Sequence, residues 1–537
     1  MMRSVKKLLS VLLCVCLLLP LAAMNAVAAS PAPLVYVYGE QGIYVYKEDG
    51  SLSYPKDESG DLISAAVSEL GGDFAKAMLT DDYAEWSEKA LEMLRPIYAD
   101  IKPAPDGSLP EGSHTDYIWD HVNILSAYGP LGVYYPYVWD FRTSPMDAAD
   151  DLKLYIDKVK AATGSDKIVL ASRCGGSEAM AAYLVKYGYG DVQKAIFFCN
   201  NLHGFTRGDL IISGNITVNA PALERYLQFN NTLDGMGISD GIYDFLMSMV
   251  ISMNKNASLQ DVADTVMRVY PKIKDSFVAP FLREFYGIGG GYIGSVDAHY
   301  EDYRDYIFPT EELKTEYAAI LEKADAYHYE VQQRIDDLLV EMDAAGVPVY
   351  FLANYGEQLQ PLGEQASYVG DDDATVTEQS YGAVCAKMEE TLPAAYIRAR
   401  QEAGLGRYIS PDKQIDASTC LFPKHTFFIK NLRHTYYCNA ADYMVQIVAN
   451  TPDITIDTFP ALPQFLTCDK DLNTVTPAQA HNDADIDWDS FDAETETDGA
   501  AGYVVERISF LAQIFSTFRS LIRMLKTLFE GMLKGAR

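Results

Sequence analysis

The stretch Ile168-Val-Leu-Ala-Ser-Arg-Cys-Gly-Gly-Ser177 decides the fold. Its first four residues form a short apolar run, which is typical of a buried strand. Ser172 and the two glycines are small enough for a tight turn, and residues 177–187 have the apolar spacing of a helix. A strand that turns directly into a helix brings Cys174 to the helix N-terminus, where free N–H groups favour a negative charge.

Strands and helices alternate on both sides of this segment. A helical tract ends near Ala99, and a second helix is predicted over residues 148–162. The predicted strands are residues 34–38, 132–138, 168–171, 194–199, 347–352 and 426–429. Alternation at this spacing predicts βαβ units and a parallel sheet.

One long segment interrupts this rhythm. Residues 216–345 are mostly helical in pattern and rich in Met and Tyr, so we expect a lid or cap inserted over the sheet. The remaining divisions are a core in two parts, residues 29–215 and 346–470, an acidic linker over 471–502, and a C-terminal amphipathic helix over 503–537.

The first 28 residues have the pattern of a secretory signal peptide. Arg3 and two lysines precede an apolar run from Leu8 to Leu21, and Ala26-Val-Ala28 offers a cleavage site. An apolar run of this length is shorter than the roughly 20 residues that a membrane span requires. We therefore expect a secreted, extracellular protein. Six cysteines would remain after cleavage, with no CxxC pair, and their pairing stays open: Cys174, Cys199, Cys385, Cys420, Cys438 and Cys468.

Composition excludes one class of partner. The 537 residues are 49% hydrophobic and 22% charged, which is typical of a globular protein. The formal net charge is −32, and a chain this acidic is unsuited to binding a phosphate backbone. We expect no nucleic-acid partner.

A nucleophile at Cys174 needs an acid and a base later in the chain. The expected order is the nucleophile, then an Asp or Glu, then a His. His434 follows the strand over 426–429 across a short loop, whereas His425 precedes that strand and His203 follows an earlier one. The acid candidate lies in Gly370-Asp-Asp-Asp-Ala-Thr-Val376, after the strand over 347–352. A solvated charge run or a cation loop is the alternative interpretation of these aspartates.

Six segments, in order, resemble motifs of the lecithin:cholesterol acyltransferase family of α/β hydrolases. Val37-Tyr-Gly-Glu-Gln-Gly42 resembles the first-strand VPGxxG, Pro136-Tyr-Val-Trp-Asp-Phe-Arg-Thr-Ser-Pro145 the PYDWR-x-x-P stretch, Ser172-Arg-Cys-Gly-Gly176 the GHSMGG-type elbow, Ile196-Phe-Phe-Cys-Asn-Asn-Leu-His-Gly204 with Leu210-Ile-Ile-Ser-Gly214 the APWGG and LxSG segments, Asp373-Ala-Thr-Val376 the DGTV motif, and Ile429-Lys-Asn-Leu-Arg-His434 the segment that ends in the catalytic histidine. The resemblance covers about residues 34–215 and 346–440.

The resemblance implies an α/β-hydrolase fold: a mainly parallel sheet with helices on both faces and a helical lid insertion. It carries the acid role to Asp373 and the base role to His434, with Cys174 in the place of the family's serine. The oxyanion would be bound by the backbone N–H groups of Gly175 and of Glu40, which follows Gly39. The implied activity is hydrolysis or transfer of the acyl group of an ester or thioester, from a small-molecule or lipid substrate, with no metal and no cofactor.

Two alternative interpretations compete with an acyl hydrolase or acyltransferase. In the first, the scaffold is catalytically degenerate and serves as a surface binding protein, and Cys174 is a small, buried hydrophobic residue. A thiol hydrolase that cleaves amides or peptides fits the same residues. Two further patterns are weak evidence for a binding site. Gly289-x-Gly291-x-x-Gly294 resembles a nucleotide-binding loop but has no βαβ unit around it. The pattern from Asp483 resembles a calcium-binding loop but has Trp488 at the position of the required glycine.

The predicted C-terminal helix has an apolar face and a basic stripe. Its basic side chains follow at steps of three and four residues, from Arg519 through Arg523 and Lys526, on a chain that is otherwise acidic. Such a helix suits the surface of an anionic membrane. Packing against the protein itself or a second copy is the alternative, and the sequence leaves both open.

Overall fold

The computed structural model describes residues 32–39, 45–54, 59–99, 101–115, 127–129, 132–204, 206, 209–210, 215–221, 223, 258–285, 297–357, 359, 362–371, 373–432, 434, 439–459, 462–469 and 474–477. The predicted signal peptide over 1–28, Glu40, the glycine pattern from Gly289, Cys438 and the helix over 503–537 lie outside the described residues.

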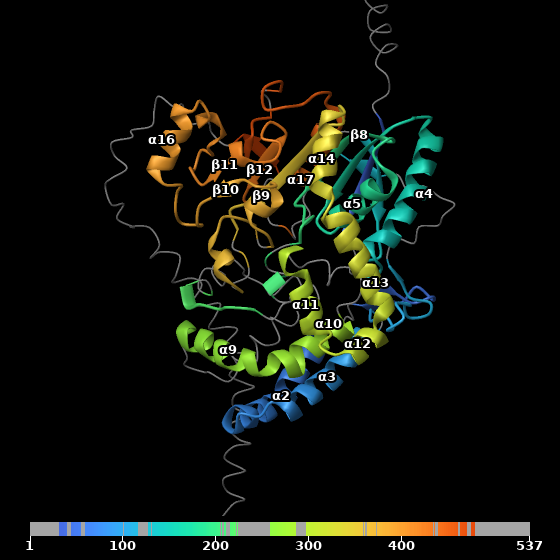
Figure 1. The fold of residues 1–537 in the computed structure, drawn as a ribbon, viewed down its shortest axis with the longest axis vertical. Coiled ribbons are helices and arrows are strands. Elements are labelled where there is room, and N and C mark those ends of the chain that lie inside the picture. The colour runs from blue at the N-terminus through green and yellow to red at the C-terminus, as the bar shows by residue number, and fades with distance from the viewer. Residues whose placement is uncertain are drawn as a thin grey trace, which may run out of the picture.

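A nine-stranded sheet forms the centre of the described chain (Figure 1). Its order is β14-β13-β12-β9-β8-β7-β1-β6-β5, and the seven strands from β13 to β6 are parallel. The strands are β1 (Leu34–Tyr38), β5 (Ala127–Gly129), β6 (Gly132–Val138), β7 (Ile168–Arg173), β8 (Val192–Phe198), β9 (Val349–Tyr355), β12 (Thr426–Lys430), β13 (Phe465–Asp469) and β14 (Thr474–Pro477). The predicted α/β class with a mainly parallel sheet is confirmed.

Helices cover both faces of the sheet. Side chains of α4 (Pro145–Thr163), α5 (Gly176–Tyr187) and α14 (Ile335–Ala344) share one hydrophobic cluster with one face of the strands. On the opposite face, α17 (Asn439–Asn450) packs in a separate cluster. Because both faces are covered, β1, β7 and β9 are buried along their whole length, which explains their continuous apolar runs.

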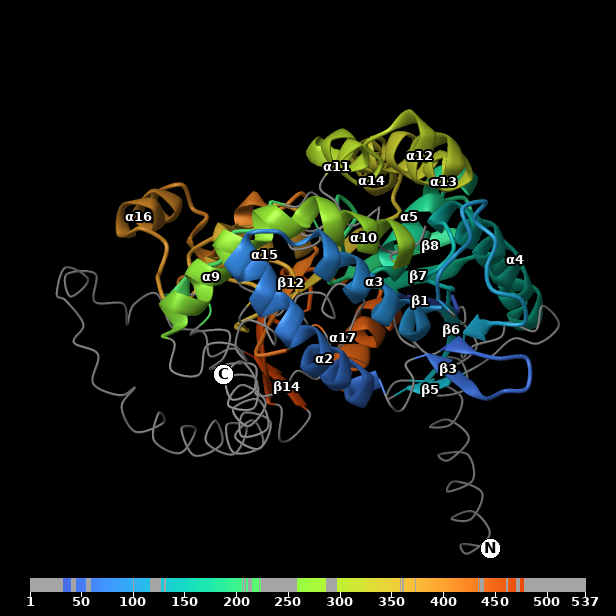
Figure 2. The same ribbon diagram turned by 90° about the horizontal axis from the view of Figure 1, so that it is seen from below.

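A layer of helices lies beside the sheet and has a core of its own (Figures 1 and 2). In it, Trp86 packs against Phe277 with ring centroids 5.2 Å apart. We call it the helical layer, and its helices are α2 (Ser59–Thr80), α3 (Ala84–Tyr98), α9 (Leu259–Ile273), α10 (Ala279–Phe285), α11 (Tyr300–Ile307), α12 (Glu311–Glu316) and α13 (Ala318–Ala326).

The helical layer differs from the predicted lid over residues 216–345 at both ends. Helices α2 and α3 precede that range, yet Phe74 and Trp86 pack in the same core as α9 and α10. Conversely α14 lies inside that range but packs on the sheet through Ile335 and Leu339. The apolar face of a helix is visible in a sequence, but the partner of that face is not, because it is set by packing between distant segments.

Shorter elements complete the described chain. A small antiparallel sheet has the order β3-β2-β4, and β10 pairs with β11. These elements are β2 (Val45–Tyr46), β3 (Leu52–Tyr54), β4 (His114–Thr115), β10 (Val384–Cys385), β11 (Ile415–Asp416), α15 (Val376–Gln379), α16 (Ala394–Glu402), the π-helical η1 (Lys274–Val278) and η4 (Tyr327–Gln332), and the 3₁₀ turns η3 (Asp297–His299), η5 (Glu364–Ser367), η6 (Gly406–Tyr408) and η7 (Ala417–Thr419).

The sheet extends further along the chain than predicted. The acidic linker was expected to begin at residue 471, but residues 474–477 form β14, which pairs antiparallel with β13 at the sheet edge. Thr476 and Val475 lie opposite Thr467 and Cys468 in this pairing. The β-branched residues of Thr474–Pro477 favour a strand, and these four residues therefore belong to the sheet and not to a linker. Across the parts of the chain that the structure describes, every helix is too short or too polar to cross a membrane.

The turn after β7 packs against the end of β1 at backbone distance. A Cβ atom on Gly176 would lie 2.3 Å from the carbonyl oxygen of Val37, and one on Gly39 would lie 2.6 Å from the nitrogen of Gly176. Neither contact can relax by side-chain motion, because backbone atoms stand on both sides. Glycine at these two positions is therefore a condition for the close approach of the two strands.

We expect Gly176→Ala to lower the free energy of unfolding by about 2–3 kcal/mol, as overpacking against fixed backbone does. Gly72→Ala is the matched control, since a Cβ on Gly72 meets no atom within 4 Å in α2. That change should raise the free energy of unfolding by about 0.5–1 kcal/mol. Urea unfolding measures both, and equal stability of Gly176→Ala and the natural chain would contradict the packing argument.

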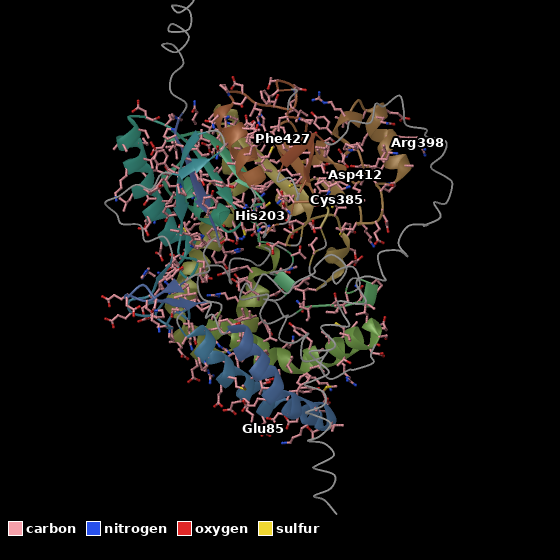
Figure 3. All side chains as sticks on the ribbon, turned by 180° about the vertical axis from the view of Figure 1, so that it is seen from behind. Glu85, His203, Cys385, Arg398, Asp412 and Phe427 are labelled. Atoms are coloured by element: carbon pink, nitrogen blue, oxygen red, sulfur yellow. The ribbon has the colours of Figure 1, made fainter. Side chains whose placement is uncertain are left out.

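A histidine, His203, which is labelled in Figure 3, joins η3 to α14 near the end of β8. Nδ1 of His203, just after β8, lies 2.7 Å from Asp297 of η3, and its Nε2 lies 2.6 Å from Asp336 of α14 and 2.5 Å from the hydroxyl of Tyr381. Burial alone would lower the pKa of His203, but its hydrogen bonds to Asp297 and Asp336 raise the pKa to about 9. The charged imidazolium therefore links these elements at neutral pH.

This link predicts a loss of stability at alkaline pH. The folded chain keeps His203 charged up to about pH 9, while the unfolded chain loses that proton near the ordinary pKa of 6.5. The contribution is thus complete below pH 6.5 and disappears as the pH rises through 9. Because the side chain is 34% exposed, solvent screening reduces the contribution to about 1–2 kcal/mol.

Free energies of unfolding at pH 6 and pH 9.5 measure this contribution. We expect His203→Gln to remove most of the decrease between the two pH values. His114→Gln, outside this cluster, is the control. An identical decrease in the natural chain and in His203→Gln would reject the role of His203.

Candidate active site

The turn that carries Cys174 has a strained backbone. Strand β7 ends at Arg173, α5 begins at Gly176, and Cys174 has a φ of +51°. Positive φ is uncommon for residues other than glycine and persists where the surrounding structure enforces it. Here the N–H of Cys174 donates to the carbonyl of Phe198 (3.1 Å), and its own carbonyl accepts from the N–H of Ser177 (2.8 Å). These bonds hold the thiol at the N-terminus of α5.

Of the residues expected to bind an oxyanion, Gly175 lies in this turn and Gly39 lies beside it. The N–H of Gly39 donates to the carbonyl of Arg173 (3.2 Å), which fixes the end of β1 against the end of β7. A Cβ on Gly39 would lie 2.7 Å from the nitrogen of Gly175, so the backbone of Gly39 closely approaches that N–H group. Glu40, the other expected donor, lies outside the described residues.

The structure brings the three predicted catalytic side chains together. The Cys174 sulfur, one carboxylate oxygen of Asp373 and one ring nitrogen of His434 all lie within 4.8 Å of one another. Nε2 of His434 is 3.5 Å from Oδ2 of Asp373. Each residue comes after a different parallel strand, β7, β9 or β12, and the carboxyl ends of these strands meet at one edge of the sheet.

A second carboxylate, which the sequence did not single out, contacts the other side of the imidazole. Oδ2 of Asp371 lies 3.2 Å from Nδ1 of His434, and the side chain is fully buried. Its Oδ1 accepts from the backbone N–H groups of Asp373 and Ala374, both at 2.9 Å. The run of aspartates after Gly370 indicated where the acid lies in the sequence. It did not indicate which aspartate contacts Nδ1 of His434 and which contacts Nε2.

These groups determine the charge of the histidine. Burial disfavours a charged imidazole, but Cys174, Asp373 and Asp371 outweigh it and hold the pKa of His434 well above its ordinary value. A charged imidazolium beside a thiol favours the thiolate form. This arrangement favours a thiolate–imidazolium pair enclosed by two carboxylates.

A second cysteine, also not singled out by the sequence as a site residue, lies on the other side of the histidine. Cys199 follows β8 and has a φ of +47°. Its sulfur lies within 4.8 Å of a carboxylate oxygen of Asp371 and of a ring nitrogen of His434. Complete burial raises the pKa of Cys199 to about 11, although a hydrogen bond to His434 acts in the opposite direction. Cys199 is thus a protonated neighbour of the site at neutral pH.

Buried polar side chains hold the frame of the site. The guanidinium of Arg173 donates to the carbonyl of His434 (2.7 Å) and lies 5.1 Å from the ring centroid of Phe198. Beneath the turn, the hydroxyl of Ser177 donates to Asn201 (2.6 Å), whose amide donates to Glu178 (2.6 Å). These bonds tie the histidine loop and the start of α5 to the strand ends.

The thiol environments predict selective alkylation of Cys174. Burial raises the pKa of Cys385, of Cys199 to about 11 and of Cys420 to about 12, whereas Cys174 lies beside the imidazolium of His434. At pH 7 we expect iodoacetamide to modify Cys174 at least about 100-fold faster than these three thiols. Residue-resolved mass spectrometry measures the rates. Cys385, which is also partly exposed, is the matched comparison, and equal labelling of the two would contradict an activated Cys174.

Comparison with known proteins gives distant structural likenesses, among them the two that follow. No family model matches this chain, and no curated protein matches it. The Tle4–Tli4 complex has a TM-score of 0.23 and 12% identity, covering 61% of this chain and 75% of that chain. A prohormone-processing carboxypeptidase from Saccharomyces cerevisiae has a TM-score of 0.17 and 10% identity, covering 60% of this chain and 65% of that chain. At these TM-scores neither likeness bears on function.

Proposed function

We propose that this protein is an acyl hydrolase or acyltransferase of the α/β-hydrolase type that uses a thiol nucleophile. The single observation that carries the proposal is the approach of Cys174, Asp373 and His434 to within 4.8 Å at the edge of a parallel sheet. The positive φ of Cys174 between β7 and α5 supports the same conclusion, because the strand–turn–helix nucleophile of α/β hydrolases has this context.

In the first half of the reaction, the thiolate of Cys174 attacks the acyl carbon and the carbonyl electrons move to oxygen. The N–H groups of Gly175 and Glu40 would bind this oxyanion, each contributing roughly 3–4 kcal/mol. The tetrahedral adduct then expels the alcohol or thiol, which takes its proton from the imidazolium of His434. The product is an acyl thioester on Cys174 and a neutral imidazole.

In the second half, His434 takes a proton from water, or from an acceptor alcohol, as that oxygen attacks the thioester carbon. The adduct expels the Cys174 thiolate, which restores the thiolate–imidazolium pair and releases an acid or a new ester. Water as the acceptor gives hydrolysis, and an alcohol gives acyl transfer.

The two carboxylates take different roles in this scheme. Asp371 faces Nδ1 at 3.2 Å and suits the task of orienting the ring, which directs Nε2 to the reacting atoms. The family resemblance implies this task for Asp373, but the Oδ2 atom of Asp373 lies 3.5 Å from Nε2, on the side where proton transfer occurs. We therefore assign orientation to Asp371 and a flanking position to Asp373.

The substrate class and location extend this proposal. We infer an ester or thioester of an apolar acyl group, with a lipid among the candidates, from the resemblance to acyltransferases. Residues 1–28 support secretion, and the basic amphipathic pattern over 503–537 supports contact with an anionic membrane surface.

Trapping of the acyl-enzyme tests the proposal. The reduced mature chain is mixed with a short-chain nitrophenyl ester, quenched in acid within seconds, and analysed by peptide mass spectrometry. We expect one acyl group on Cys174, with a burst of nitrophenol equal to the enzyme concentration. No adduct and no burst, with esters, thioesters and peptide amides alike, would leave a binding protein on a degenerate scaffold as the better interpretation.

A further inference from the structure

One feature of the site exceeds what a thiol triad requires. A triad needs one carboxylate, on Nδ1 of the histidine, and Asp371 occupies that place at 3.2 Å. Asp373 adds a second negative charge 3.5 Å from Nε2, within 4.8 Å of the Cys174 sulfur. The imidazolium of His434 supplies one positive charge against the Cys174 thiolate and the two carboxylates. These four groups together therefore carry an excess of negative charge, which a bound cation would balance.

The three groups on the Nε2 side form a metal-ligand set. Zn²⁺ is bound by thiolate, imidazole and carboxylate at about 2.0–2.3 Å in a tetrahedron, so its donor atoms lie about 3.3–3.8 Å apart. The distance of 3.5 Å between Asp373 and His434 already has this value. The sulfur of Cys174 lies within 4.8 Å of both, so a shift of about 1 Å completes the three positions.

Asp371 supplies the supporting contact of such a site. In metal centres the ligating histidine donates its other N–H to a carboxylate, which fixes the ring and its tautomer. Asp371 faces Nδ1 of His434, and the N–H groups of Asp373 and Ala374 hold its other oxygen. When Nε2 loses its proton on metal binding, its lone pair is thereby directed toward Asp373.

We infer that Cys174, Asp373 and His434 bind one Zn²⁺ ion and that the bound ion blocks the thiol. One thiolate and one carboxylate balance the charge of the ion, and three protein ligands leave a fourth position for water. Binding goes beyond the proposed function and does not depend on it, whereas inhibition rests on that function. Soft sulfur with imidazole and carboxylate favours Zn²⁺ over Mg²⁺ or Ca²⁺, which take oxygen ligands.

A second triplet, Cys199, Asp371 and His434, has the same donor types but is less accessible. Cys199 and Asp371 are almost completely buried, while Cys174 is partly exposed to solvent. Both oxygens of Asp371 already accept hydrogen bonds or face the imidazole. Entry of an ion from solvent therefore favours the triplet with Cys174.

Binding is tested with Co²⁺ as a spectroscopic probe of the reduced mature chain, followed by competition with Zn²⁺. We expect one equivalent of Co²⁺ with a sulfur-to-cobalt charge-transfer band that Zn²⁺ removes. Cys174→Ala and Asp373→Asn should weaken binding at least 100-fold, beyond the roughly 10–100-fold of an outer-shell change. Cys199→Ala should bind within threefold of the natural chain. A natural chain without the band, or a band lost in Cys199→Ala and kept in Cys174→Ala, would overturn the inference.

Inhibition is measured separately, by the burst of nitrophenol with and without Zn²⁺. We expect Zn²⁺ to abolish the burst and a chelator to restore it. If the chelated chain shows no burst but Co²⁺ binds through Cys174, the proposed function fails and the metal site stands. If the burst persists at saturating Zn²⁺, or increases, the inhibitory role is rejected. The thermal melting of each variant shows whether a loss of binding comes from unfolding.

Discussion

Replacement of Cys174 by alanine should abolish the hydrolysis of short acyl esters, with turnover reduced at least about 1,000-fold. The change removes the nucleophile and prevents the acyl thioester, so the residual rate is that of water in the same pocket. Burst kinetics with a nitrophenyl ester in the presence of a chelator measure the loss. Because Cys174 is partly exposed, the smaller side chain should cost little stability.

Cys199→Ala is the matched control, since among the described cysteines Cys199 is the second one with its sulfur within 4.8 Å of a ring nitrogen of His434. With its pKa raised to about 11 by burial, Cys199 does not provide the thiolate, and we expect turnover to remain within about threefold. If Cys174→Ala retained normal turnover, Cys174 would leave the mechanism. If Cys199→Ala lost as much as Cys174→Ala, the nucleophile would have to be reassigned.

The central fold could be predicted from sequence because its signals are local. The apolar run Ile168–Ala171, the small residues around Cys174 and the following helix lie within about twenty residues and specify β7, the turn and α5. The alternation of strands and helices fixed the α/β class for the same reason. In contrast, the assignment of α2 and α3 to the helical layer depends on contacts such as Trp86 with Phe277, almost two hundred residues apart.

The site shows the same division. Cys174 and His434 could be chosen because each follows a recognisable strand. Asp371 and Asp373 could not be distinguished, because consecutive aspartates differ in direction through a turn whose N–H groups bind the Asp371 carboxylate. Cys199 was missed as a site residue because its approach to His434 depends on the pairing of β7 with β8 and on its positive φ. Neither feature has a sequence signature at a cysteine.

A matched pair of isosteric changes separates the two carboxylates. We expect Asp371→Asn to lower kcat by about 10²–10⁴-fold, or about 3–5 kcal/mol in activation free energy, with little change in KM. An amide at this position can donate to Nδ1 and hold the wrong tautomer, so Nε2 could not accept the proton of the attacking water. Asp373→Asn should lower kcat by less than about tenfold, because Asp373 lies on the Nε2 side at 3.5 Å and does not orient the ring.

Both variants must be assayed with a chelator, since Asp373→Asn should also relieve inhibition by Zn²⁺ and could otherwise seem more active than the natural chain. The reverse order of effects, a large loss in Asp373→Asn and a small one in Asp371→Asn, would return the orienting role to Asp373 as the sequence predicted. Equal large losses would mean that the two carboxylates act as one unit around the imidazole.

Because Asp371 is fully buried and accepts hydrogen bonds from two backbone N–H groups, the unfolding curve of Asp371→Asn must be measured together with its kinetics. If kcat falls while the free energy of unfolding and KM stay unchanged, the loss lies in the chemical step. The variant then folds and binds substrate, but its imidazole no longer transfers the proton in the required direction.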